Sequence, residues 1–360
     1  RGQKPPTLIP TDCFVLRTPT ILPNIRISWD YHPTFMPLCF LLYAGYCSFF
    51  NRRTIFLAIL TTFCYVNHEN TEITRCLMPI KGYIIEKYNA MTNAYTCNRL
   101  VQEASALDMD LQIVGIHDTT VSMQGVINHG KILEPVDFVI NRYKWGREKD
   151  AINALATRSY NPLTAYNIYI NKFEQVRRLH SEAFLIPKYL LGTSLLPFSS
   201  IVEQLGLPFV AKGLESSMGE EIACIRDKAS YEELSLNYPS SKEWLFEEFI
   251  SESYGRDLRF YSIRGEAVAC MQRRSQGDFR ANVALGASVE PYPVTPGIRT
   301  IAADIYEQTG LDFLGIDLLF GREKPYFCEI NVMPGLEGIE KASGINVAAK
   351  VLETIRSDFA

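Results

Sequence analysis

From residue 78 onward, short apolar runs alternate with longer segments in which apolar residues recur every three or four positions. Apolar runs at 81–87, 111–118 and 137–143 predict strands. Between the first two runs, apolar residues return at helical spacing, at Cys97, Leu100, Val101, Ala104 and Leu107. This order of strand, helix and strand predicts a small α/β domain that ends near residue 165.

The next part of the chain mixes helices with closely spaced strands. Helices are predicted over 170–184 and near 198–205 and 230–237. Strands are predicted at 186–192, 208–213, 221–227 and 244–250.

The last third of the chain favours antiparallel strands. Residues 256–274 form two runs that meet at Arg264-Gly265, which is a hairpin signal. A helix near 298–308 precedes strands at 312–321 and 325–333, and a further helix is predicted over 347–359. The pattern as a whole predicts an α+β fold with an α/β N-terminal part.

Residues 1–77 have a different composition from the rest of the chain. They hold five of the nine cysteines, seven prolines and only two of the 22 glycines, and their net charge is +3 against −7 for the remainder. Their apolar runs at 35–50 and 54–66 are shorter than the 18 or so residues of a membrane span. We interpret 1–77 as an appendage outside the catalytic fold, of the kind an over-extended reading frame produces; a membrane anchor or hairpin is the alternative.

Charge and cysteine usage exclude two classes of protein. The net charge of −4 argues against a general nucleic-acid binder, so no nucleic-acid partner is expected. The nine cysteines form no CxxC pair and the five histidines are isolated, so the sequence carries no zinc signature.

Three oxygen-bearing side chains are predicted to meet on the last two strands. Glu329 and Asn331 are two apart in a strand and therefore point to one face, and Asp317 lies in the neighbouring strand between apolar residues. Two carboxylates about 4 Å apart repel by roughly 4 kcal/mol at an effective dielectric of about 20, so such a pair attracts a cation. Carboxylate and amide oxygens suit magnesium shared with phosphate. A polar face of an edge strand is the alternative interpretation.

Other polar residues could contact a phosphorylated ligand. Lys212 ends a predicted strand before a turn with Ser216, Ser217 and Gly219, whose backbone N–H groups could cradle phosphate, although an ordinary hairpin loop has the same pattern. No GxxxxGK[ST] motif is present.

Further along, the strand end at Glu248 and Phe249 could meet the edge of a base, and Asp257 could accept from ribose hydroxyls. Arg280 and Asn282 are two apart and share a face if extended, where an arginine would stabilise a phosphoryl group. Each of these residues, taken singly, could equally be a solvated surface residue.

One series of motifs runs through the chain in order: Lys172, Lys212, "ESSMGEE", "EEFI", "GRDLR", "GDFRAN", "GIDLL" and "CEINVMPGLEGIEKASGINVA". This series resembles the ATP-grasp superfamily, and within it the RimK-type α-L-glutamate ligases and the related lysine-biosynthesis ligases. The resemblance covers about residues 80–357 and does not include 1–77. It implies an ATP-grasp fold in which a pre-ATP-grasp α/β domain at 78–165 precedes two α+β subdomains, 166–245 and 246–360, that clasp ATP.

The resemblance also implies roles for individual residues. Lys172 and Lys212 would contact ATP phosphates, Glu248 and Phe249 would lie on the adenine-binding strand, and Asp257 would hold the ribose.

Magnesium, for which manganese can substitute, would be held by Asp317, Glu329 and Asn331. Arg280 and Asn282 would be the catalytic residues that face the phosphoryl group.

The chain departs from the family pattern at two places. Ser216 and Glu221 stand where the family's phosphate loop commonly has glycine, which bears on how the loop holds phosphate. Val332 and Met333 are bulkier than the small residues frequent after the metal-binding strand, which bears on the shape of the acceptor pocket.

The expected reaction is carboxylate activation: ATP phosphorylates an acceptor carboxylate, and the amine of an amino acid displaces phosphate. The expected amine donor is glutamate, and the acceptor carboxylate belongs to a small molecule, a peptide or a protein C-terminus. A peptide-modifying or lysine-biosynthesis-type ligase and a non-catalytic ATP-binding module are the alternatives. A cytoplasmic location without a membrane partner is expected, and a homo-oligomer is among the open assembly states.

Overall fold

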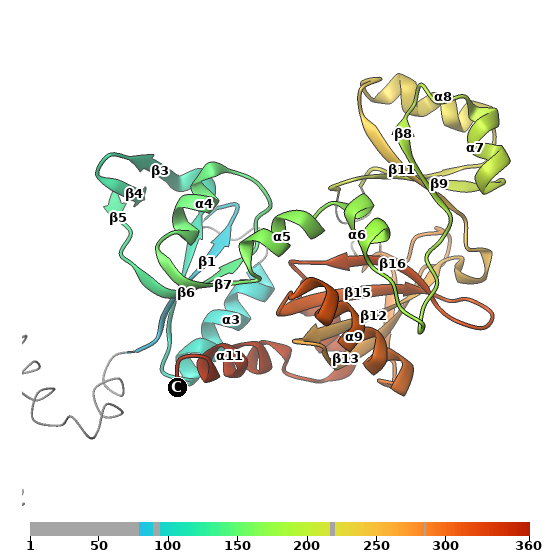
Figure 1. Cartoon of the computed structure of the whole chain (residues 1–360). Coiled ribbons are helices and arrows are strands. Elements are labelled where there is room, and N and C mark those ends of the chain that lie inside the picture. The colour runs from blue at the N-terminus through green and yellow to red at the C-terminus, as the bar shows by residue number, and fades with distance from the viewer. Residues whose placement is uncertain (1–78, 89–93, 217–219, 284–285) are drawn as a thin grey trace, which may run out of the picture. The chain divides into compact units, whose positions relative to one another are not determined.

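The computed structural model (Figure 1) describes residues 79–88, 94–216, 220–283 and 286–360. The chain divides into two units at residues 76 and 77, and the described residues belong to the second unit. The expected appendage, residues 1–77, therefore lies outside the described residues.

A parallel sheet in the order β2-β1-β6-β7 forms the first described part. Residues 82–86 of its inner strand β1 are all buried, because α3 and α11 cover one face through Ile84 and α4 covers the other through Ile85. A small antiparallel sheet, β3-β4-β5, lies between β2 and β6 in sequence. The bounds are β1 Lys81–Glu86, α3 Ala94–Ala106, β2 Asp110–Gly115, β3 Thr119–Ser122, β4 Gly125–Asn128, β5 Lys131–Ile132, β6 Val136–Asn141, α4 Arg147–Asn153 and β7 Ala156–Tyr160.

The second part is an antiparallel sheet in the order β10-β9-β11-β8, with α7 and α8 against it (Figure 1). Aromatic side chains of the strands, among them Phe209 and Trp244, pack with Tyr231 of α8 in one cluster. Helix α8 begins with a capping box between Asp227 and Ser230, which satisfies backbone N–H groups that have no partner inside the helix. The bounds are β8 Tyr189–Thr193, α7 Phe198–Leu205, β9 Phe209–Gly213, β10 Ile222–Ile225, α8 Lys228–Asn237 and β11 Glu243–Glu248.

The third part is a five-stranded antiparallel sheet in the order β14-β13-β12-β15-β16. Helix α9 packs on it; Thr295 caps its start, Pro296 is its first residue, and Gly310 ends it at φ +63°. The bounds are α5 Leu163–Tyr169, α6 Lys172–Arg178, β12 Arg256–Ile263, β13 Glu266–Arg274, β14 Ser288–Pro291, α9 Pro296–Thr309, β15 Phe313–Leu319, β16 Tyr326–Asn331, α10 Glu337–Ser343 and α11 Val347–Ser357.

The outer side of β16 is covered by segments that precede it in sequence. The side-chain amide of Gln175 donates to the carbonyl of Ile330 at 3.0 Å and accepts from its N–H at 2.8 Å. Further along the strand, the N–H of Phe327 donates to the carbonyl of Leu185 at 2.8 Å. These bonds fix the strand that carries Glu329 and Asn331.

The fold class predicted from the sequence is confirmed, with differences in single elements. The helix expected over 170–184 ends at Arg178: Leu179 is extended, and the N–H of His180 donates to Gln308 at 3.0 Å instead of to the helix. The short or mainly polar elements α4, α5, α10, β7, β14 and the β3-β4-β5 sheet were not predicted. In the part of the chain that the structure describes, no helix has the length and apolar character needed to cross a membrane.

Candidate active site

Most of the predicted site residues meet at one cavity. It encloses about 740 Å³, counting space open to solvent. Its walls come from β9 and β11 of the second part and from β12, β13, β15 and β16 of the third. The predicted residues that line this larger cavity are Lys212, Glu248, Phe249, Asp257, Arg280, Asn282, Asp317 and Glu329.

Lys172 and Asn331 are not among the residues that line the larger cavity. Lys172 Nζ nevertheless lies 3.7 Å from Oε2 of Glu329 and donates to the carbonyl of Ser216 at 2.5 Å, so it links β16 to the loop after β9. The Oδ1 atom of Asn331 accepts from the N–H of Met333 at 3.0 Å, which closes the turn that follows β16.

The two predicted metal-binding carboxylates are partners across β15 and β16. The Cα atoms of Asp317 and Glu329 face each other in the antiparallel register. The expectation that these two carboxylates repel each other without a cation between them is wrong, because arginines already neutralise Asp317. Arg259 donates to both oxygens of Asp317 at 2.6 Å each, and Arg273 donates to one of them at 2.7 Å. Burial acts to raise the pKa of Asp317, but the two arginines outweigh it and hold the pKa below its usual value.

Asp257 is held in the same network. Arg273 donates to its two oxygens at 2.6 Å each, and both residues are buried. Burial raises the pKa of Asp257 above its usual value in spite of Arg273. Asp257 and Arg259 are two apart in β12, so the i, i+2 rule that was applied to Glu329 and Asn331 would also have marked Arg259.

Lys212 forms a second buried ion pair. Its Nζ lies 2.5 Å from Oε2 of Glu247 and 3.8 Å from Sγ of Cys328. Burial acts to lower the pKa of Lys212, but the acidic groups of Cys328 and Glu247 outweigh it and raise the pKa above its usual value. Burial raises the pKa of the Cys328 thiol to about 12.

Glu247 was not predicted as a site residue, because only the backbone of the "EEFI" strand end was considered. Its Oε1 is buried and has no hydrogen-bond partner among the described residues, although Glu247 lines the larger cavity. A buried oxygen without a donor is costly, so it suits a ligand that brings an N–H or O–H group.

Arg280 and Asn282 lie outside any strand, so the shared face that was expected of them if extended does not come from a sheet. The side chain of Arg280 is turned toward Asp278, to which its Nη2 donates at 2.6 Å. Both predicted catalytic residues still line the larger cavity.

At the end of the loop between β9 and β10, Glu221 adopts a backbone conformation that is typical of glycine. Glu221 has φ of +51°, in the left-handed region that glycine adopts most easily, and its carboxylate pairs with Lys242. At the start of the loop, Lys144 Nζ donates to the carbonyl of Glu215 at 2.6 Å, and Trp145 Nε1 donates to its carboxylate at 3.0 Å. Ser217 and Gly219 lie outside the described residues.

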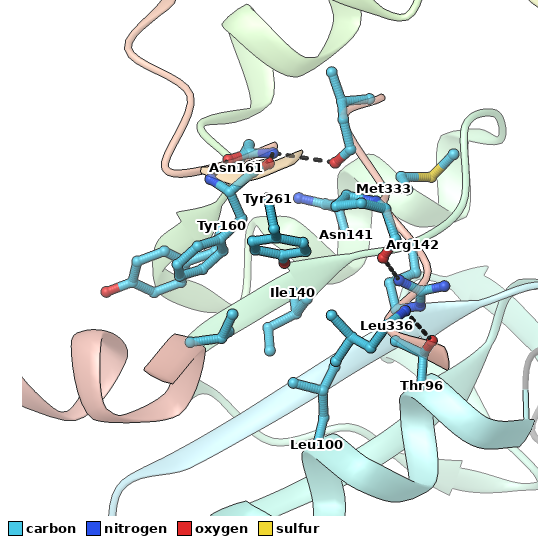
Figure 2. A pocket seen from close by; sticks show the side chains of 14 residues that line it. Thr96, Leu100, Ile140, Asn141, Arg142, Tyr160, Asn161, Tyr261, Met333 and Leu336 are labelled. Carbon is cyan, nitrogen blue, oxygen red and sulfur yellow. Dashed lines mark hydrogen bonds between the residues drawn. The ribbon is translucent and has the colours of Figure 1, made fainter. Parts of the chain in front are cut away.

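A smaller cavity of about 350 Å³ lies beside the segment that follows β16 (Figure 2). Arg142 Nη1 donates to the carbonyl of Pro334 at 3.1 Å, and the N–H of Leu336 donates to Thr96 at 3.0 Å. Asn161 donates to the carbonyl of Val332 at 3.1 Å. The first part of the fold thereby holds the segment after β16.

The bulkier residues noted in that segment have defined places. Val332 is buried in the core of the third part, and the Met333 sulfur accepts from the hydroxyl of Tyr166 at 2.6 Å. Met333 therefore fills space next to α5 on the wall of the smaller cavity.

Comparison with known proteins identifies the family of the chain. The family model described as RimK-like ATP-grasp domain matches residues 170–355. The chain belongs to the RimK-like ATP-grasp family. The matched range contains β8 to β16 and every residue predicted to bind nucleotide or metal.

Two curated relatives carry the name "Probable alpha-L-glutamate ligase". The protein from Thioalkalivibrio sulfidiphilus is 36% identical over 160 residues, which cover 44% of this chain and 53% of the relative. The protein from Aeromonas salmonicida is 29% identical over 277 residues, which cover 72% of this chain and 91% of the relative. The first match thus spans about half of its relative.

Solved structures share the fold of this RimK-like chain. The ATP-grasp ligase PsnB, solved with a minimal precursor, has a TM-score of 0.59 at 13% identity, with 78% of this chain and 99% of PsnB covered. Another structure of PsnB holds the minimal precursor, magnesium and ADP and has a TM-score of 0.57. At this identity the likeness shows the fold alone.

The residues present fit ATP and magnesium by donor chemistry. Asp317 and Glu329 supply hard oxygen ligands from paired strands, and Lys212 supplies a fixed positive charge. Within the described residues, no group of three or more His, Cys, Asp or Glu side chains could hold a metal ion. A magnesium site here therefore needs amide or phosphate oxygens in addition to the two carboxylates.

Proposed function

We propose that this protein is an ATP-dependent carboxylate–amine ligase that joins an amino acid, glutamate first among candidates, to an acceptor carboxylate. One observation carries the proposal: the larger cavity gathers the two hard carboxylates Asp317 and Glu329 from one sheet, the buried Lys212 from another, and the predicted catalytic Arg280 from the segment between β13 and β14. Membership of the RimK-like ATP-grasp family and the names of the curated relatives support the same chemistry.

The nucleotide is proposed to be ATP. Lys172 and Lys212 face the phosphates, and Glu248 and Phe249 border the base. The unpaired oxygen of Glu247 supports a ligand that brings a hydrogen-bond donor, as the amino group of adenine does. The ribose role of Asp257 requires a hydroxyl to share a carboxylate that Arg273 already holds.

Asp317, Glu329 and Asn331 would hold magnesium, with manganese as a substitute. A bound divalent ion supplies charge neutralisation between phosphate oxygens. Arg280 and Asn282 are placed to stabilise charge on the transferred phosphoryl group once Arg280 exchanges Asp278 for it.

The reaction proceeds in two steps that these residues position. An acceptor carboxylate oxygen attacks the γ-phosphorus of ATP. The bond from this phosphorus to the β,γ-bridging oxygen breaks, so that an acyl phosphate forms and ADP leaves. The amine then attacks the acyl carbon, loses a proton and displaces inorganic phosphate, which leaves an amide. No side-chain nucleophile is needed, because catalysis rests on positioning and charge stabilisation.

The acceptor is proposed to be a small molecule, a peptide or a protein C-terminus, and the location to be cytoplasmic. The precursor in the PsnB structures supports a peptide, and the names of the curated relatives support glutamate as the added amino acid. A lysine-biosynthesis-type ligase would differ from this proposal in its substrate. A non-catalytic module would bind ATP without turnover.

The test is an acceptor and amino-acid screen with the full chain, ATP and magnesium. We expect ADP only with a matched pair, and a product whose mass equals acceptor plus amino acid minus one water. Glu329→Gln is the matched control for background hydrolysis. If ATP binds but no pair in the screen yields ADP above this control, the non-catalytic alternative is correct.

A further inference from the structure

Arg259 occupies the space between the two predicted metal-binding carboxylates. Its Nε and Nη2 each lie 2.6 Å from one oxygen of Asp317, and Nη2 also lies 4.0 Å from Oε1 of Glu329. A guanidinium that meets both oxygens of a carboxylate has the strongest ion-pair geometry. We propose that Arg259 is a built-in counter-cation, which neutralises this pair in the metal-free protein and must withdraw before a metal ion binds.

The neighbouring Arg273 is not suited to this exchange. It binds both oxygens of Asp257 as well as Asp317, and its side chain is only 3% exposed. The side chain of Arg259 is 18% exposed and binds only the two metal-binding carboxylates among its ion-pair partners in the described residues. Arg273 therefore fixes Asp317 in place, whereas Arg259 can leave toward solvent without breaking an ion pair outside these two carboxylates.

This arrangement sets the order in which ligands enter. A lone divalent ion would displace Arg259 and leave two cationic groups close together in a partly buried site, where like charges repel strongly. An ion that arrives with nucleotide brings phosphate oxygens, whose negative charge offsets both cations. Metal and nucleotide therefore enter together, an inference that rests on the proposed function for the roles of Asp317 and Glu329.

The experiment measures Mn²⁺ binding to the full chain without nucleotide, from the electron paramagnetic resonance signal of free Mn²⁺. Removal of one positive charge next to a divalent ion in a partly buried site strengthens binding of that ion by about tenfold or more. We therefore expect Arg259→Gln to lower the Kd for Mn²⁺ by at least about tenfold. A non-hydrolysable ATP analogue should raise Mn²⁺ affinity in the wild type far more than in Arg259→Gln.

Arg322→Gln is the matched control for the loss of one positive charge. The Arg322 side chain is 86% exposed and pairs with Glu252, so its removal should change the Kd for Mn²⁺ by less than about twofold. Thermal melting in a chelator checks that each variant is folded.

An unchanged or weaker Mn²⁺ affinity in folded Arg259→Gln overturns the proposal. If that variant does not fold, Arg259→Lys replaces it, because lysine keeps the charge and loses the two-pronged contact. Its Mn²⁺ affinity should exceed that of the wild type, and equality overturns the proposal. If Arg259→Gln leaves the Kd for Mn²⁺ unchanged while the wild type forms ADP normally, only the role of Arg259 is contradicted. If the wild type forms no ADP, the proposed function is contradicted and the Mn²⁺ result still stands.

Discussion

Strand β16 lines the larger cavity and the segment that follows it lines the smaller one, yet the two linings are opposite in kind. Nine of the 20 residues that line the larger cavity are charged, and Glu247 there keeps an oxygen without a donor. Only Arg142 is charged among the 14 residues of the smaller cavity, and it is neutralised by Glu86 at 2.9 Å. Buried polar groups that are satisfied internally stabilise a fold, whereas unsatisfied and closely packed charges mark a place for a ligand.

The strongest test of this contrast is Glu329→Gln. The carboxylate faces Lys172 and Arg259 rather than an unpaired Asp317, so its neutralisation should leave the melting temperature nearly unchanged. Loss of one electrostatic stabiliser of a reacting phosphoryl group costs up to about 10³-fold in turnover. We expect a loss of that order in ADP formation and a higher magnesium requirement. Near-normal turnover at low magnesium would reduce Glu329 to an ordinary polar residue on a strand.

Arg142→Gln tests the smaller cavity. It leaves Glu86 buried without a cation and removes the bond to Pro334, which should lower the free energy of unfolding by about 3 kcal/mol. Urea denaturation measures the loss, and the double variant with Glu86→Gln should recover part of it. ATP affinity measured well below the melting temperature should stay the same. A large fall in affinity would show that the smaller cavity also serves the ligand.

Lys212→Met tests whether the larger cavity binds phosphate through this charge. Charge-assisted contacts contribute about 1.5–3 kcal/mol, so the Kd for ATP should rise by about tenfold to 100-fold in titration calorimetry. The change also leaves the buried Glu247 without its ion-pair partner. The double variant with Glu247→Gln is therefore the proper reference for folding. Unchanged affinity in both variants would remove Lys212 from the nucleotide site.

The smallest effect is expected at Cys328. With a pKa of about 12, its thiol is kept protonated by burial near Asp317 and Glu329. At pH 8 the thiolate fraction is about one in 10,000, against roughly one quarter for an exposed cysteine. Iodoacetamide should label Cys328 hardly at all at pH 8, and the rate should rise with pH. Labelling at the rate of glutathione, measured by peptide mass, would show that the cavity wall is open to water.

The sequence predicted the larger cavity better than the interactions inside it. Motif order and the period of two placed Asp317 opposite Glu329, because strand geometry follows from local pattern. The partners of Asp317 escaped prediction, because Arg273 reaches it from a strand 44 residues away in sequence. Nothing local distinguishes such an arginine from a solvated one.

The smaller cavity was not predicted for the same reason. Thr96 lies in α3, and Arg142 and Asn161 directly follow β6 and β7; each of the three bonds a backbone group more than 150 residues away. Their meeting depends on how the first part of the fold packs on the third. A single sequence contains no periodic signal for that packing.

The covering of β16 has a consequence for association between molecules. A strand at the rim of a sheet normally offers free N–H and C=O groups on which another chain can add a strand. Here the side-chain amide of Gln175 bonds both backbone groups of Ile330, as the peptide group of a neighbouring strand would. The backbone carbonyl of Leu185 accepts from the N–H of Phe327. The rim is thus already occupied at these two positions. An extended peptide therefore cannot pair with β16 at these two positions, which works against both aggregation through this strand and capture of a substrate by strand addition.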